Sequence, residues 1–167
     1  MLAVFADTHR SAGHGLTDAE RDAALRADRI VHAGDFTTPA VYDAFADLGD
    51  LHAVHGNADA AAVRKRLPTV RALAVGSVRV LVVHRQRGGG TGLSMLGRER
   101  DADLVVSGHT HVPTLVDGDP VLCNPGSHAD PRGASPGFAT VVPTADGATV
   151  SLRAPDGDVV DSRSVDG

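Results

Sequence analysis

Seven polar residues that can bind metal ions occur in five short blocks along the chain. The blocks are Asp7-Thr8-His9, Gly34-Asp35, Gly56-Asn57, His84 and Gly108-His109-Thr110-His111. Together they offer two carboxylates, one amide oxygen and four imidazoles, a donor set that suits Mn, Fe, Co, Ni or Zn. This number of ligands favours two metal ions over one, with a carboxylate bridging them. Because two ions roughly 3.5 to 4 Å apart can clamp an in-line displacement at phosphorus, the residues predict phosphoryl chemistry.

Each block stands at the end of an apolar run that predicts a buried β-strand. We expect these strands over residues 2–6, 29–33, 51–55, 77–83 and 104–107. Helices are expected over residues 18–27, 39–48, 59–66 and 93–100. The alternation of strand and helix indicates a parallel sheet. Ligands of such sheets bind outside the carboxyl ends of the strands, so the seven side chains are expected to converge there.

The remaining segments predict a hairpin, a loop and a β-rich C-terminal part. Residues 70–75 and 77–83 flank Gly76 and form the expected hairpin. The segment from Arg85 to Gly92 is basic and Gly-rich, and we expect a loop there. From Thr114 onward, Gly, Pro and Asp turns separate β-prone runs at 121–122, 138–142, 149–152 and 159–160. No internal repeat or linker interrupts the chain, so residues 1–167 are predicted to form one domain.

The composition narrows the class of protein. The net charge of −5 argues against an extended nucleic-acid surface, although it leaves a local basic patch open. No apolar run is long enough to span a membrane, and the apolar stretch at residues 1–5 is too short for a signal peptide and lacks its basic start, so a cytoplasmic location is expected. Cys123 is the single cysteine, which excludes an internal disulfide and a structural thiolate zinc site. Any metal must therefore bind to His, Asp and Asn.

In this order, the five blocks resemble the motifs of the calcineurin-like metallophosphoesterases, in particular their compact bacterial and archaeal phosphodiesterase branch. The segment Asn124-Pro125-Gly126-Ser127, followed by Pro131-Arg132, also resembles a loop of that branch. Each block alone is a weak signal, and the ordered set is a strong one. The resemblance implies an α/β fold, a four-layer α/β/β/α sandwich of two mixed β-sheets flanked by helices.

The resemblance also implies a role for each residue. Asp35 would bridge two divalent transition-metal ions, and Asp35, Asn57 and His109 would be the catalytic residues. Manganese is the expected metal, with nickel, iron, cobalt and zinc as alternatives. The implied reaction is hydrolysis of a small phosphate ester, most readily a phosphodiester, by in-line attack of a hydroxide held between the ions. The first ion would be held by Asp7, His9, Asp35 and His111, and the second by Asp35, Asn57, His84 and His109.

The chain departs from the family pattern at two positions. Larger relatives carry a histidine after the Gly-Asn pair that can protonate the leaving group, whereas here Ala58 and Asp59 follow. This indicates weak general-acid catalysis and favours diesters or good leaving groups. Arg85 stands where the family usually has glycine, and we expect Arg85 and Arg10 to bind the substrate phosphate. Arg87 is a third candidate.

The remaining histidines fall into two groups, those that match no family motif and those that lie next to one. His14, His32 and His52 are interpreted as structural, whereas His55 and His128 adjoin family motifs and are expected to support the metal ligands. Cys123 is interpreted as a small core residue.

Two further functional hypotheses remain open from the sequence. The same fold resembles that of a eukaryotic retromer subunit that serves as a protein-interaction scaffold, and a phosphomonoesterase or a mononuclear metallohydrolase would use similar ligands. Metal content separates the scaffold and mononuclear hypotheses from a two-metal enzyme. The physiological substrate is left open, and a homodimer is one assembly to test.

Overall fold

The computed structural model describes residues 1–167, which form two mixed β-sheets. The larger sheet has six strands in the order β11-β10-β9-β1-β2-β3. Strands β1, β2 and β3 are parallel, and the other neighbours are antiparallel. The strands span Leu2–Phe5 (β1), Arg29–His32 (β2), Leu51–Ala53 (β3), Phe138–Pro143 (β9), Gly147–Arg153 (β10) and Val159–Asp166 (β11).

The smaller sheet has five strands in the order β4-β5-β6-β8-β7. The expected hairpin forms its edge, with β4 antiparallel to β5, and β5, β6 and β8 run parallel. The strands span Val70–Val75 (β4), Val78–Val83 (β5), Leu104–Val106 (β6), Thr114–Val116 (β7) and Val121–Asn124 (β8). Each sheet therefore contains a parallel part whose carboxyl ends can meet those of the other sheet.

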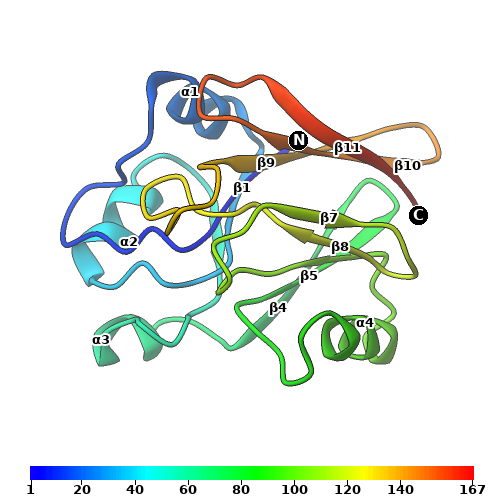
Figure 1. Cartoon of the computed structure of the whole chain (residues 1–167), viewed down its shortest axis with the longest axis horizontal. Helices are drawn as coiled ribbons and strands as arrows, with labels where there is room; N and C mark the ends of the chain where they lie inside the picture. Colours follow the sequence, from blue (N-terminus) through cyan, green and yellow to red (C-terminus); the bar gives the residue numbers. More distant parts are fainter.

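Four helices cover the outer faces of the two sheets (Figure 1). Three pack on the larger sheet and the fourth packs on the smaller one, so the layers are α/β/β/α as expected. Two of these helices begin at clear N-terminal caps: Thr17 and Glu20 form a capping box on α1, and Thr38 caps α2 ahead of Pro39. The helices span Asp18–Arg26 (α1), Pro39–Ala46 (α2), Ala61–Arg64 (α3) and Gly89–Glu99 (α4).

Alternation along the strands divides the core between the layers. In β1, Leu2 and Val4 point into the space between the sheets, whereas Ala3 and Phe5 point towards the helices. The same alternation in β5 and β6 supplies the central core and the contact with α4. The central core is built mostly from Val, Leu and Ala, and Phe5, Phe36, Phe45 and Phe138 gather on the helix side of the larger sheet.

Three sequence predictions are corrected by the structure. The loop expected from Arg85 to Gly92 is shorter, because α4 begins at Gly89, where packing against the sheet outweighs the low helix propensity of glycine. Strand β7 was not predicted, and β11 continues well beyond residues 159–160 to Asp166. Both strands are edge strands with alternating exposed residues, which give a weak apolar signal.

None of the four helices combines the length and the apolar character that a membrane span requires.

Candidate metal centre

The seven candidate ligands lie on loops at the carboxyl ends of five parallel strands. Asp7 and His9 follow β1, Asp35 follows β2 and Asn57 follows β3. His84 follows β5 of the second sheet, and His109 and His111 follow β6. The two sheets face each other, so both sets of loops open at the same end of the sandwich, as the sequence predicted.

Asp35 occupies the centre of this cluster. Its Oδ2 atom lies 3.2 Å from His9 Nε2 and 3.3 Å from His84 Nε2. Its other oxygen, Oδ1, accepts a hydrogen bond from the Ala58 amide at 2.7 Å. One carboxylate oxygen therefore faces two imidazoles that come from different sheets.

Asp7 and His111 contribute atoms that the protein leaves without a hydrogen-bond partner. Asp7 Oδ1 and His111 Nε2 are both buried and unpaired, and they lie 3.6 Å apart, too far for a hydrogen bond. Buried polar atoms are normally satisfied, since leaving one unpaired costs roughly 1–3 kcal/mol. A cation between Asp7, His9 and His111 would satisfy both atoms, and donor atoms of these three residues lie within 4.8 Å of one another.

His84, Asn57 and His109 form the outer side of the cluster. His84 Nδ1 donates to the Ala33 carbonyl at 2.8 Å, which leaves Nε2 without a proton in the neutral ring and suited to a metal. That Nε2 atom lies 3.1 Å from Asn57 Oδ1. The His109 ring stands edge-on to His84 with centroids 5.2 Å apart. Asn57 and His109 are exposed, so this side opens to solvent. A second group of donor atoms within 4.8 Å joins Asp7, Asp35 and His84.

The two carboxylates respond differently to burial. Burial raises the pKa of Asp7, and the nearby imidazoles of His84 and His111 only partly offset it. Burial also acts to raise the pKa of Asp35, but hydrogen bonds from His84 and His9 outweigh it and hold the pKa below its usual value. Burial lowers the pKa of His84, an effect that the contact with Asp35 more than reverses. Asp35 is thus the carboxylate whose charged form the neighbouring imidazoles stabilise more strongly.

Two of the motif glycines are required by the carboxylates. A Cβ atom on Gly56 would lie 2.0 Å from Asp35 Oδ1, and one on Gly108 would lie 2.8 Å from Asp7 Oδ2. Both distances are shorter than any tolerated contact. The Gly-Asn and Gly-His pairs therefore place a ligand from one loop directly against the backbone of another.

The backbone of the centre lies in the sparsely populated left-handed region at five of the seven ligands. The φ angles are 53° at Asp7, 45° at His9, 62° at Asp35, 74° at His109 and 62° at His111. Such conformations cost energy for residues other than glycine and cluster at functional sites. The surrounding hydrogen bonds must therefore hold these loops in place.

Residues outside the ligand set provide those hydrogen bonds. The carboxylate of buried Asp59 accepts from the amides of Asp35, Thr37 and Gly56 at 3.1, 2.8 and 2.7 Å. Ser127 Oγ donates to the Asp7 carbonyl at 2.6 Å, and the Asp130 carbonyl pairs with His111 Nδ1. Sequence reasoning did not find the role of Asp59, since it rests on contacts across the fold. Ser127 belongs to the Asn-Pro-Gly-Ser segment, whose resemblance was the available signal.

His32 is also a support that the sequence did not indicate. It contacts no candidate ligand side chain, in line with its structural interpretation. Its Nδ1 accepts from the Gly34 amide at 3.2 Å and its Nε2 lies 2.8 Å from Thr8 Oγ1, so it ties together the first two ligand loops. Burial lowers the pKa of His32 well below its usual value, which keeps the ring neutral.

The other histidines lie outside the ligand cluster. His52 pairs with Asp50 at 3.1 Å on the surface, and His14 accepts from the Leu16 amide at 3.0 Å. His55 lines a pocket next to Asn57. His128 packs against Phe5 and bonds to the His14 carbonyl at 2.9 Å, so it supports the loop after His9 rather than a ligand.

The arginines that lie near the ligand cluster differ from those expected from the sequence. Arg85 is exposed beside His84 and lines the pockets on both sides of it. The Arg10 side chain instead folds against Gly15 and bonds to the Ala12 carbonyl at 3.4 Å, with no contact to the ligand cluster. Arg132 was not singled out from the sequence as a binding residue. Its Nη2 lies 3.4 Å from His9 Nε2, and its Nε donates to Asp130 Oδ2 at 3.0 Å.

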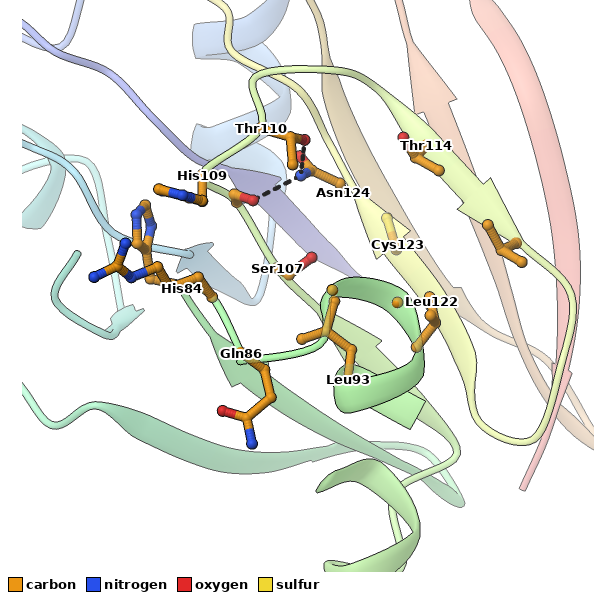
Figure 2. A pocket seen from close by; sticks show the side chains of 15 residues that line it. His84, Gln86, Leu93, Ser107, His109, Thr110, Thr114, Leu122, Cys123 and Asn124 are labelled. Atoms are coloured by element: carbon orange, nitrogen blue, oxygen red, sulfur yellow. Dashed lines mark hydrogen bonds between the residues drawn. The ribbon is translucent and has the colours of Figure 1, made fainter. Parts of the chain in front are cut away.

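Two pockets adjoin the outer side of the centre and share His84, Arg85 and Gln86. The first has a volume of about 210 Å³ and extends past His109 to Leu93 and Leu122 (Figure 2). The second has a volume of about 420 Å³ and extends past Asn57 to Arg64. The centre thus opens into one partly apolar space and one polar space.

Comparison with known proteins places this centre in a family. Residues 1–146 match the model of the calcineurin-like phosphoesterase superfamily domain. A probable metallophosphoesterase of Methanocaldococcus jannaschii is 35% identical over 138 residues, which cover 79% of this chain and 70% of the relative.

Among solved structures, a Vps29 variant from Entamoeba histolytica is similar with a TM-score of 0.78 and 22% identity, covering 99% of this chain and 98% of that one. YfcE, a phosphoesterase from E. coli, is similar with a TM-score of 0.68 and 20% identity, covering 99% of both chains. At these identities the two structures show the common fold. The family model and the archaeal relative show more: the chain belongs to the calcineurin-like phosphoesterase superfamily.

Proposed function

We propose that this chain is a phosphodiesterase that uses two divalent metal ions. The observation that carries the proposal is the position of Asp35, whose Oδ2 atom lies at 3.2 and 3.3 Å from imidazoles of the two different sheets. A carboxylate in that position can contact two cations at once. We assign Asp7, His9 and His111 to one ion and Asn57, His84 and His109 to the other, with Asp35 shared.

When bound, such a pair of ions lowers the pKa of water and neutralises charge on the phosphoryl oxygens. The donor set of oxygen and imidazole nitrogen suits manganese, which is the metal we propose, and also suits nickel, iron, cobalt and zinc. The buried, unpaired atoms of Asp7 and His111 support a cation on the inner side of the centre.

The protein's own residues would bind and orient the ester. Arg132 beside His9 and Arg85 beside His84 provide a positive charge on each side of the centre, where they can bind phosphoryl oxygens. His109 and Asn57 are exposed and can contact the substrate as well as a metal. Arg10 is no longer a candidate for this role, because its side chain lies elsewhere.

The position after Asn57 supports a preference for diesters. Ala58 supplies no acid, and the neighbouring Asp59 already accepts three backbone amides, so neither can protonate a leaving alkoxide. The two pockets that meet at His84 would receive the two substituents of a diester, whereas a monoester would fill only one.

The experiment that tests the proposal is an assay of matched esters combined with metal analysis. Phosphodiesters and monoesters of the same alcohols are offered to protein loaded with Mn²⁺ or Ni²⁺, and bound metal is counted. Two ions per chain and faster turnover of diesters are expected. Well-placed acid catalysis is worth roughly 10² to 10⁴ in rate, so rates should fall steeply as the leaving group becomes more basic.

Ala58→His would then speed substrates with poor leaving groups selectively. A flat dependence on leaving-group pKa in the wild type, with chemistry rate-limiting, would contradict the assignment of Ala58. Faster turnover of monoesters would favour the phosphomonoesterase alternative.

A scaffold function is the second candidate, because Vps29 proteins have the same fold. It predicts a chain that carries no transition metal and gains no hydrolytic activity when Mn²⁺ or Ni²⁺ is supplied.

A further inference from the structure

We propose that the smaller pocket beside the metal centre binds an aromatic ring of the substrate. The pocket begins at His84 and His109 and continues away from the ligand cluster. The inference deepens the proposed function: it assigns the substrates to esters of phosphate in which one substituent carries a ring of aryl or nucleobase size. The ring would lie in this pocket while the phosphate lies on the centre.

The inner wall of the pocket is apolar and firmly anchored. Leu93 of α4 and Leu122 of β8 line it, and both pack on the buried cluster that joins α4 to the smaller sheet. Val116 of β7 completes the wall. Figure 2 shows Leu93 and Leu122 close together, away from His84 and His109. The apolar surface thus lies in the same pocket as His84 and His109, on the side away from them.

The size of the pocket fits a single ring system. Its volume is about 210 Å³. An engineered apolar cavity of about 150 Å³ in another protein holds benzene, whereas sites for drug-sized ligands measure roughly 300 to 1,000 Å³. Gly89 and Gly90 form part of the lining without side chains, and a Cβ atom on Gly90 would stop 3.8 Å from Leu122 Cδ1. The glycines therefore leave the space open.

The polar groups of the pocket favour a neutral ring over a charged or hydroxyl-rich group. Arg85 is the only lining residue with a full charge, and it stands at the end near the centre. Asn124 is already engaged: its Nδ2 donates to the Gly108 carbonyl and to Thr110 Oγ1, and its Oδ1 accepts from the Gly126 amide, each at 2.9 Å.

The larger pocket on the other side of His84 has the opposite character. Arg64, Arg85 and His55 line it together with further polar side chains. Val70 and Val83 are its only apolar lining residues, and no carboxylate lines it. A charged or hydroxyl-rich substituent fits that side, so the two pockets distinguish the two substituents of a diester.

The test compares the binding of phenylphosphonate and methylphosphonate to the Mn²⁺-loaded protein by calorimetry. Both carry the same phosphonate group, so their affinity ratio measures the contribution of the ring alone. Burial of one ring face supports a preference of about tenfold or more for the phenyl compound. Gly90→Val narrows the pocket and should reduce that ratio to about one. Leu122→Ala removes part of the wall and should reduce it several-fold. Met95→Ala, on the exposed face of the same helix, is the matched control and should leave the ratio unchanged.

The outcomes separate this inference from the proposed function. A protein that hydrolyses diesters but binds both phosphonates equally would overturn the ring site and leave the phosphodiesterase proposal intact. A protein that prefers phenylphosphonate through Leu122 and Gly90 but turns over no ester would retain the ring site and refute the activity. A phenyl preference that survives both variants would place the ring elsewhere and overturn the assignment. Adenosine 5′-phosphonate as a third probe decides between a nucleobase and a smaller aryl group.

Discussion

The two halves of the metal centre are built differently. The inner half, defined by Asp7, His9 and His111, is buried or half-buried, and two of its atoms lack hydrogen-bond partners. The outer half, defined by Asn57, His84 and His109, has two exposed members, and its Asn57 and His84 already contact each other at 3.1 Å. Both pockets are lined by the outer half, and neither is lined by the inner half. For the proposed pair of ions, this difference predicts a tighter inner position and an outer position that meets the substrate.

The largest effect is expected for Asp35→Asn, because Asp35 belongs to both halves. A neutral amide cannot supply the negative charge that two cations would share, so transition-state stabilisation should fall by several kcal/mol, on the order of a thousandfold in kcat/KM. Steady-state kinetics and metal counting on the same sample measure this. A variant with wild-type turnover would remove Asp35 from the bridging position.

The second prediction separates the halves by metal affinity. Titration of the metal-free protein with Mn²⁺ should show a tight step and a weaker step. His111→Ala should weaken the tight step by more than the roughly 10- to 100-fold that follows loss of an outer hydrogen-bond partner, and Asn57→Ala should weaken only the other step. If Asn57→Ala weakens the tight step, or if the wild type has one affinity class, the division into halves is wrong.

The third prediction concerns a support of the inner half. Burial lowers the pKa of His128 to about 4, and this ring holds the loop that follows His9. The His128 imidazole binds a proton at a pKa near 6.5 in the unfolded chain but only near 4 in the folded chain. The free energy of unfolding is therefore largest above about pH 6.5 and decreases as the pH falls towards 4. The loss should reach roughly 3 kcal/mol. Urea denaturation of the metal-free protein between pH 7 and pH 4 measures it.

In this titration His128→Gln should flatten the dependence of stability on pH. The variant is compared with His52→Gln, which alters an imidazole at the surface. Equal slopes for wild type and His128→Gln would show that other groups cause the loss.

The fourth prediction compares the two glycines that contact the carboxylates. Gly56→Ala and Gly108→Ala should each destabilise the fold by about 1–3 kcal/mol through overpacking. The larger effect is expected at Gly56, whose Cβ would lie 2.0 Å from Asp35 Oδ1 against 2.8 Å between Gly108 and Asp7 Oδ2. Gly49→Ala, where the nearest atom is 3.7 Å away, is the control. Denaturant midpoints give the order, and the reverse order would place the tighter contact at Gly108.

The smallest effects are expected for the two arginines. Arg132→Ala on the inner side and Arg85→Ala on the outer side should each raise KM by about threefold to tenfold with little change in kcat, because an exposed contact made equally before and during the reaction contributes binding alone. Arg26→Ala on α1 serves as the control. An unchanged KM across several esters would leave either arginine as a solvated loop residue.

The sequence predicted where the seven candidate side chains gather, because each block ends an apolar run. The strand ends and the parallel arrangement follow from local pattern, whereas the four layers were expected from the resemblance to the phosphoesterase family. The roles of Asp59 and His32 could not be predicted, because each bonds to a loop that is distant along the chain. Ser127 also bonds to a distant loop, and its only signal was the resemblance of its segment to the family. The arginines also show this: Arg10 is adjacent to His9 in sequence, yet its side chain folds away, whereas Arg132 lies 123 positions after His9 and reaches it.

The left-handed backbone of the ligand loops has a consequence for how such a chain can change over time. At His9, and at four other ligands, the side chain that chemistry requires is one that the local conformation disfavours, and glycine would adopt the same φ without cost. Selection for activity and selection for stability therefore oppose each other at these positions. In a lineage that no longer needs catalysis, mutation would replace these ligands first, and the fold would persist as its reactive edge disappeared.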